Sequence, residues 1–374
     1  MERTDRIRLL DILRGVAILG TLGTNIWIFA YLGDLSYITT SQFSSWWELD
    51  DFVRMIILFL VNGKLLGLLT IMFGVGMELK YRQMQRKGRP WPGVYMWTAV
   101  FLLVEGFLHF TLVMEYDILM SYGVTAIIAA FIIKRGEKVI SCTMKALGGI
   151  HAAVILLVMI GGLLGANMSL GSFQEVVGLY RDGSWIEQVQ YRLANFLPLR
   201  AEAIFVIPMN IFLFLLGVRL MRSGVFAEGE EGKRKRGKLL KWGLGIGLPL
   251  NALIFIPGGV FDLPVRYLFA PILALGYIGV IGRVVENSKG ILIWRCLEKT
   301  GQMSLSCYVT QNILASAIFY GWGLGLGGKL DALGVILIWI SISLIQVLFA
   351  ASWMNAFKLG PLEAARQRML KAFM

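Results

Sequence analysis

Long apolar runs separated by short polar segments dominate the chain. A helix needs roughly 20 mostly apolar residues to cross a bilayer, within a range of about 17–25, and most of the runs approach this length. The pattern predicts an all-α, polytopic transmembrane helix bundle in which residues 1–374 form a single membrane domain. About ten spans are expected, at 9–31, 53–79, 94–113, 118–133, 139–166, 199–218, 242–256, 267–282, 303–320 and 333–354.

The overall composition supports this prediction. Apolar residues make up 57% of the 374 residues and charged residues only 16%, whereas soluble domains carry roughly 25% charge. So many apolar runs cannot be buried in one water-soluble core of this size. A bilayer is therefore their natural solvent, and we expect a multi-pass protein of the cell membrane in contact with membrane lipids.

The basic residues indicate the orientation. If the N-terminus is cytoplasmic, the inner segments hold 27 Lys and Arg residues and the outer segments only 4. This bias predicts that both termini are cytoplasmic and that the number of spans is even. The net charge of +12 follows the ends of the spans instead of forming one basic face, so nucleic acid is not an expected partner.

Three segments outside the spans have compositions that predict their local structure. The longest outer loop, 167–198, contains enough apolar residues to form an amphipathic helix on the membrane surface. The inner loop 223–241 is rich in Gly, Glu, Lys and Arg and is expected to be flexible and basic. The tail 360–374 alternates apolar and basic residues, which predicts an interfacial helix on the inner leaflet.

Charged groups inside spans cost about 2.5–3.5 kcal/mol each on the insertion scale, so they are the best pointers to function. In the first span, Asp11, Arg14 and Asn25 share one broad helix face, because three and eleven residues correspond to nearly whole numbers of turns. Arg14 lies near the inner end and Asn25 about 16 Å further out. One interpretation is a structural ion pair with an interhelical amide, and the other is a ligand site.

The hairpin of the third and fourth spans carries a second candidate site. Glu105 and His109 are four residues apart on one helix face, and Asp117 opens the next span after a short turn. A carboxylate beside an imidazole can hold a general base in one tautomer. The same pair could instead be a structural contact that closes the hairpin. Because the chain has only two histidines and no supporting Cys or carboxylate spacing, no metal site is expected.

Further polar residues within or at the ends of spans are weaker candidates for substrate binding. Lys64 lies mid-span and needs a partner or a wet cavity, because its predicted position leaves no route for snorkelling to the interface. For the amides, hydrogen bonding between helices is the alternative interpretation. The remaining candidates are Arg200, Glu202, Gln311 and Asn312.

Several motifs, in order along nearly the whole chain, resemble the YeiB-like bacterial integral membrane family, also called domain of unknown function 418. They are LLDILRGVAILGTLGTN (9–25), GKLLGLLTIMFGVGMEL (63–79), GFLHFTLVMEYDIL (106–119), GQMSLSCYVTQNILASAIFYGWGLGL (301–326) and FKLGPLE (357–363). This family is in turn similar, chiefly in the first span, to membrane acyltransferases that include heparan-α-glucosaminide N-acetyltransferase. In those enzymes an Arg-Gly precedes a polar reaction-centre residue by eleven positions, which here corresponds to Arg14 and Asn25.

The resemblance implies transfer of an acyl group from cytoplasmic acyl-CoA to an outer sugar or another hydroxyl or amine acceptor. Arg14, next to Asp11, would contact the CoA, and Asn25 would bind the thioester or its oxyanion. An amide cannot act as a base, so that role would fall to His109, oriented by Asp117. The alternatives are a carrier or exporter of a small molecule or lipid, which buried charges and kinked spans also fit, and a receptor-like scaffold. An oligomer is compatible with each of these.

Overall fold

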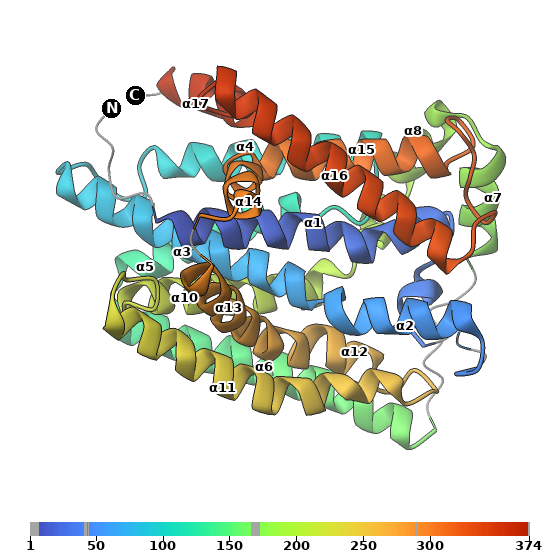
Figure 1. The fold of residues 1–374 in the computed structure, drawn as a ribbon, viewed down its shortest axis with the longest axis horizontal. Coiled ribbons are helices and arrows are strands. Elements are labelled where there is room, and N and C mark those ends of the chain that lie inside the picture. The colour runs from blue at the N-terminus through green and yellow to red at the C-terminus, as the bar shows by residue number, and fades with distance from the viewer. Residues whose placement is uncertain (1–6, 41–42, 44, 166–172, 289, 373–374) are drawn as a thin grey trace.

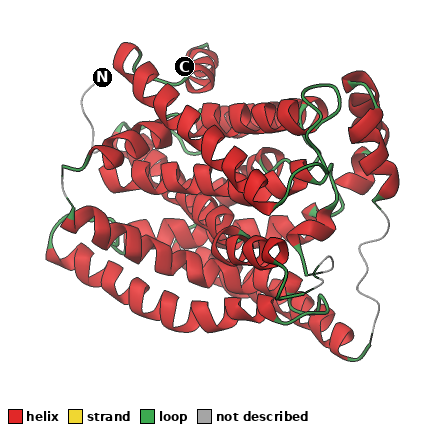
Figure 2. Ribbon diagram, turned by 45° about the vertical axis from the view of Figure 1, so that its right-hand side comes forward, coloured by secondary structure: helices red, strands yellow, loops and turns green. Residues whose placement is uncertain are grey.

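The computed structural model describes residues 7–372 except 41–42, 44, 166–172 and 289, and all regular structure in that part is helical (Figures 1 and 2). The all-α prediction is therefore confirmed. The elements are α1 (Arg8–Ala30), η1 (Leu35–Ile38), α2 (Leu49–Val61), α3 (Lys64–Arg86), α4 (Tyr95–Leu112), α5 (Leu119–Lys134), α6 (Glu137–Leu163), α7 (Gln174–Asp182), α8 (Trp185–Ala194), α9 (Phe196–Leu199), α10 (Ala203–Arg222), α11 (Glu230–Ala252), η2 (Leu253–Phe255), α12 (Asp262–Pro264), η3 (Val265–Phe269), α13 (Ala270–Asn287), α14 (Leu292–Gln302), α15 (Ser304–Phe319), α16 (Ala332–Ala356) and α17 (Pro361–Lys371).

Seven segments in the described part of the chain are helical, long and apolar enough to cross a bilayer. These segments support a multi-pass membrane protein. They are Arg8–Ala30, Leu49–Arg86, Tyr95–Leu112, Glu137–Leu163, Ala203–Arg222, Asp262–Asn287 and Ala332–Ala356. The three other predicted spans fall on α5 and α15, which have 16 residues each, and on α11, whose first turns are charged.

The long helices form a bundle with α1 and α3 near its middle, α16 on one side and α6 and α11 on the other (Figure 1). Small residues let neighbouring helices approach closely, as is usual in membranes. A Cβ atom at Gly217 of α10 would lie 2.1 Å from the Ile71 carbonyl oxygen of α3. Similarly, a Cβ atom at Gly301 of α14 would lie 1.8 Å from the Asp11 carbonyl oxygen of α1.

The second predicted span, 53–79, is not one continuous helix. The chain leaves the helical path between α2 and α3, where Gly63 has a φ of 74°, a left-handed conformation that favours glycine. The Asn62 side chain donates from Nδ2 to the Ile38 carbonyl oxygen at 3.0 Å, which fixes the break. A Cβ atom at Gly63 would lie 2.6 Å from the Arg266 carbonyl oxygen, so η3 packs directly against the break.

The segments expected outside the spans are largely helical. The 167–198 loop contains α7 and α8, although residues 167–172 lie outside the described residues; the position of these helices on the membrane surface stays a prediction. The tail forms α17, as expected, over Pro361–Lys371. The prediction of a flexible loop over 223–241 is wrong for its second half, because α11 begins at Glu230. Pairs one helical turn apart stabilise this start, with Lys233 donating to Glu230 at 2.7 Å and Lys235 donating to Glu231.

Candidate functional site

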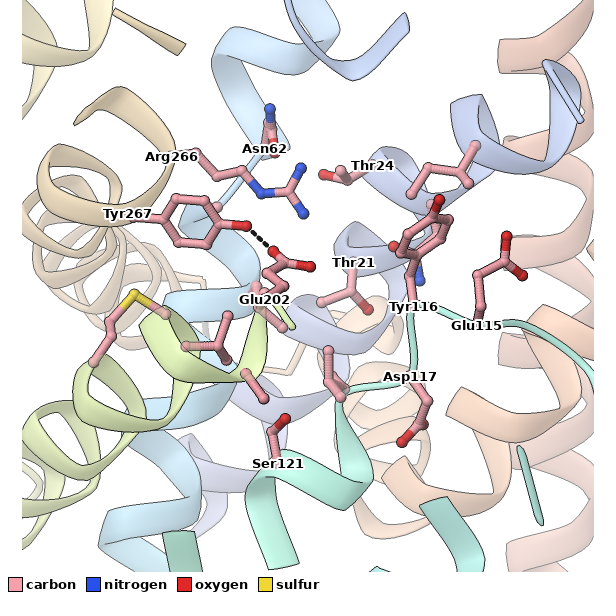
Figure 3. A pocket seen from close by; sticks show the side chains of 18 of the residues that line it. Thr21, Thr24, Asn62, Glu115, Tyr116, Asp117, Ser121, Glu202, Arg266 and Tyr267 are labelled. Carbon is pink, nitrogen blue, oxygen red and sulfur yellow. Dashed lines mark hydrogen bonds between the residues drawn. The ribbon is translucent and has the colours of Figure 1, made fainter. Parts of the chain in front are cut away.

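A polar cavity of about 70 Å³ lies between helices toward the end of the bundle away from the chain termini (Figures 1 and 3). Its walls come from the C-terminal half of α1, the α2–α3 break, the α4–α5 turn, the start of α10, and η3. Five chain segments that are distant in sequence thus bring their polar side chains to one place. The polar side chains that surround it include Thr21, Thr24, Asn25, Asn62, Tyr116, Ser121, Arg200, Glu202, Arg266 and Tyr267.

Glu202 is the carboxylate that points into this cavity (Figure 3). It is solvent-exposed, and its Oε1 accepts a hydrogen bond from the Tyr267 hydroxyl. Arg266 extends into the same space between Asn62 and Thr24 (Figure 3). In the described part of the chain the Arg266 guanidinium has no carboxylate within ion-pair distance, and its Nε atom has no hydrogen-bond partner. The cavity therefore combines the accessible Glu202 carboxylate with a guanidinium that can donate hydrogen bonds to an anionic or oxyanionic ligand atom.

Arg200 is held more firmly than Arg266. Its Nη1 donates to the Asp117 carbonyl oxygen at 2.8 Å and its Nη2 to the Ser121 hydroxyl at 3.0 Å. Its guanidinium carbon also lies 5.8 Å from the centre of the Phe110 ring, a cation–π contact. Arg200 therefore braces the α4–α5 turn against the start of α10 while lining the cavity.

The predicted pair of His109 and Asp117 is present, but it lies behind the cavity wall. The two side chains are 3.1 Å apart, from Nδ1 to Oδ1, and are only 1% and 0% exposed. His109 does not line the cavity, and the Asp117 carboxylate points away from it (Figure 3). His109 therefore does not face the cavity that Asn25 lines, as its expected role as the base beside Asn25 would require. Sequence spacing gave the membrane depth of both residues, but not the direction in which their side chains point.

The contacts around His109 indicate that the His109–Asp117 pair joins helices. The Asn312 amide nitrogen lies 3.2 Å from Nε2, and the Tyr308 ring packs at 5.2 Å between centres. If the amide donates to Nε2, the remaining ring proton is on Nδ1 and faces Asp117. The other oxygen of Asp117, Oδ2, accepts from the Met120 amide at 2.9 Å. This network joins α4, α5 and α15 and closes the hairpin.

The other candidates from the sequence are distributed around the cavity. Asn25 lines it, as does Glu202. Gln311 stands behind its wall, with Nε2 3.5 Å from the Thr21 hydroxyl oxygen. Lys64 is fully buried outside the lining, with Nζ 3.5 Å from the Leu58 carbonyl oxygen. Glu105 is also buried outside the lining, and neither of its oxygens has a hydrogen-bond partner among the described residues.

Asp11 and Arg14 lie nearer the terminal end of the bundle and are not part of the cavity. Their side chains form the expected pair, with Nη1 of Arg14 3.5 Å from Oδ1 of Asp11. Nη2 of Arg14 lies 3.5 Å from the Met72 carbonyl oxygen, so the guanidinium fits between α1 and α3. The Arg14 side chain is 26% exposed and keeps access to solvent or to a ligand.

Sequence reasoning missed Arg266, Tyr267 and the threonines of α1. In the predicted topology, Arg266 is one of the four Lys and Arg residues of the outer segments. The one signal near it is the short, Pro271-containing span that follows. That span begins irregularly in the structure, because residues Val265–Phe269 form a π-helix, an element that is frequent at functional sites.

Comparison with known proteins finds one family model and several uncharacterized relatives that are similar to this chain. The model of the family described as "Protein of unknown function (DUF418)" matches residues 220–371. The uncharacterized protein YxaH of Bacillus subtilis (strain 168) is 26% identical over 96% of this chain and 92% of its own length. The uncharacterized protein YeiB of Escherichia coli (strain K12) is 26% identical over 97% of this chain and 96% of its own. Residues 220–371 thus match the DUF418 family, and the chain is homologous to YeiB and YxaH over nearly its full length.

Proposed function

We propose that the protein is a membrane acyltransferase that moves an acyl group from acyl-CoA to a hydroxyl or amine acceptor in the polar cavity. One observation carries the proposal: Asn25, the residue eleven positions after Arg14, lines the same cavity as the Glu202 carboxylate and the Arg266 guanidinium. Acyl transfer needs a base for the acceptor and donors for the oxyanion, and this arrangement supplies both.

The donor would approach from the terminal end of the bundle. Arg14, held beside Asp11 yet partly exposed, suits a CoA phosphate or pantetheine contact. Eleven residues of helix separate Arg14 from Asn25, which corresponds to about 16 Å. A long substrate that lies along α1 would therefore place its acyl end at the cavity while its polar end stays at the opposite mouth.

In the proposed reaction, the acceptor oxygen or nitrogen attacks the thioester carbonyl carbon. The new C–O or C–N bond forms as the C–S bond breaks, and the acceptor proton moves to Glu202 and then to the departing CoA sulfur. Arg266 and the Asn25 amide would stabilise the negative charge that develops on the carbonyl oxygen. Tyr267, which donates to Glu202, would orient the carboxylate.

The proposal includes a ten-span topology with both termini in the cytoplasm. The spans would be α1, the broken pair α2–α3, α4, α5, α6, α10, α11, α13, α15 and α16. Both ends of the chain lie at the same end of the bundle, as an even number of spans requires (Figure 1). The charge bias of 27 to 4 supports a cytoplasmic position for that end.

The test is acyl transfer by purified protein in nanodiscs, with radiolabelled acetyl-CoA and a panel of sugar, amine and lipid acceptors. We expect acceptor-dependent transfer that falls about 10²–10⁴-fold in Glu202→Gln, as is typical for a lost general base. Glu175→Gln, the same change on an exposed residue of α7 outside the cavity, should transfer at the wild-type rate. Undiminished transfer by Glu202→Gln would refute the assignment of the base.

The break between α2 and α3 favours a second candidate, a carrier of a small polar molecule. Asn62 and Gly63 at the break line the cavity, and discontinuous helices commonly form transporter binding sites. In proteoliposomes, a carrier would exchange labelled solute against an internal pool without any covalent change. Solute exchange without acyl transfer would favour the carrier, and transfer without exchange would exclude it.

A further inference from the structure

An apolar groove of about 520 Å³ lies beside the polar cavity, between α6, α10 and the start of α13. Its walls are mainly aliphatic and aromatic, with Phe212, Leu216, Leu268 and Ile272 among them. Gly148 and Gly149 of α6 leave space on one side. In a membrane bundle, a hydrocarbon chain from the bilayer has the chemistry that matches such a groove.

The groove and the cavity share a wall. Met209 of α10 and Tyr267 of η3 line both spaces. The Tyr267 hydroxyl contacts Glu202 on the cavity side, whereas the Tyr267 carbonyl oxygen lies 3.1 Å from Nε2 of His151 on α6. A molecule with its chain in the groove and its polar end at Met209 and Tyr267 would therefore lie next to the cavity.

Arg266 directly precedes Tyr267 and gives the cavity side of this shared wall a positive charge. Its guanidinium lies in the cavity near Asn62 and Thr24 (Figure 3). Glu202, the carboxylate on the same side of the cavity, hydrogen-bonds to Tyr267 and forms no ion pair with Arg266 within 4 Å in the described part. A guanidinium without a contacting carboxylate suits the phosphate of a lipid headgroup.

We infer that the acceptor is a phosphate-bearing membrane lipid with a hydroxylated headgroup. One hydrocarbon chain lies in the α6–α10–α13 groove, the phosphate meets Arg266, and the headgroup hydroxyl reaches Glu202 past Tyr267. The role as acceptor rests on the proposed acyl transfer, whereas binding of the lipid does not. The reaction is the one given above, with the headgroup hydroxyl oxygen forming the new ester; with this acceptor the Asn25 amide serves the carbonyl oxygen and Arg266 serves the phosphate.

The groove allows a matched pair of variants. A Cβ atom at Gly149 meets nothing within 4 Å, and this residue lines the groove, so Gly149→Trp fills the groove without a backbone clash. A Cβ atom at Gly245 of α11 also meets nothing, but this exposed residue does not line the groove. Gly245→Trp is therefore the same change outside the proposed site.

The experiment uses phosphatidylglycerol with a photoactivatable diazirine in one acyl chain, added to phosphatidylcholine nanodiscs that contain the full chain. Cross-linked peptides should come from α6, α10 and the start of α13. Labelling should fall several-fold in Gly149→Trp and stay unchanged in Gly245→Trp. A diacylglycerol probe with the same chain has a hydroxyl but no phosphate and should label the groove less. Arg266→Gln should abolish this difference between the two probes.

Equal labelling of all lipid-facing helices, unaffected by Gly149→Trp, would overturn the proposal. Equal labelling by the two probes in the wild-type chain would overturn the phosphate contact. If groove labelling follows the expected pattern but no acyl group reaches the lipid from acyl-CoA, lipid binding stands and the proposed function fails. If acyl transfer to a lipid-free acceptor is measured and Gly149→Trp leaves it unchanged, the proposed function stands and the lipid acceptor is refuted.

Discussion

At the scale of single residues, position relative to the cavity distinguishes Glu202 from the pair of His109 and Asp117. Glu202 is exposed to the cavity and hydrogen-bonded to Tyr267, so it can exchange a proton with a ligand. His109 and Asp117 are a closed pair, with side chains that are almost completely buried. Removing one partner of such a buried pair leaves the other as an uncompensated polar group, which is costly.

His109→Ala should therefore act on stability. We expect a loss of about 3–5 kcal/mol, the range for breaking a buried pair, observed as a lower melting temperature in detergent. Asp117→Asn in the same chain should recover part of this loss, because it removes the unpaired carboxylate. Glu202→Gln, by contrast, should melt close to the wild-type temperature. A His109→Ala variant that melts like the wild type but has no turnover would instead support a catalytic histidine.

At the scale of elements, the helices α7 and α8 attach to the bundle through a second buried charge. Nε of Arg192 on α8 lies 3.7 Å from Oε2 of Glu115 in the α4–α5 turn, and Nη1 donates to the Thr111 carbonyl oxygen at 2.7 Å. The Tyr180 hydroxyl of α7 donates to Glu115 at 2.5 Å. Burial raises the pKa of Glu115, and Arg192 and Tyr180 oppose this rise. These three side chains thus attach α7 and α8 to the α4–α5 turn, which lines the cavity.

Arg192→Met should make the stability of this region depend on pH. Without the guanidinium, the pKa of Glu115 in the folded state rises further above its value in the unfolded chain. The folded state then binds a proton more readily, so its stability is greatest at low pH and is lost as the pH rises. We expect the variant to melt at a higher temperature at pH 5 than at pH 8, a difference that Glu115→Gln should remove. A melting temperature independent of pH would contradict this prediction, because it would show that Glu115 does not depend on Arg192 to balance its charge.

Some elements follow directly from the sequence, and others depend on tertiary contacts. The α1, α6 and α16 helices lie within a few residues of the predicted spans, because their apolar runs are long and contain few charged residues. The break at Gly63 is not part of the predicted span 53–79, because the apolar runs on both sides of Asn62-Gly63-Lys64 are read as one helix. The Asn-Gly dipeptide is a turn signal that indicates the left-handed glycine found there. Asn25 and Glu202 are candidates from the sequence alone, because they are polar residues within or at the ends of predicted spans. Arg266 is not, because its place in the cavity depends on the π-helix that carries it.

At the scale of the whole molecule, the chain separates three candidate binding regions. Arg14 lies toward the end that holds both termini, and the polar cavity lies toward the other end. The apolar groove opens beside the cavity between α6, α10 and α13. On this account a donor from one side and an acceptor from the membrane meet at Asn25 and Glu202. A carrier would need none of this separation, only a site that opens alternately to each side.

The most direct test of this account is a structure of the full chain in nanodiscs with a non-hydrolysable acyl-CoA analogue. The account predicts density for the CoA moiety at Arg14, with the acyl end beside Asn25 and within reach of Glu202. Density for the analogue anywhere else, or a cavity that binds a free solute while the Arg14 region binds no CoA, would contradict it.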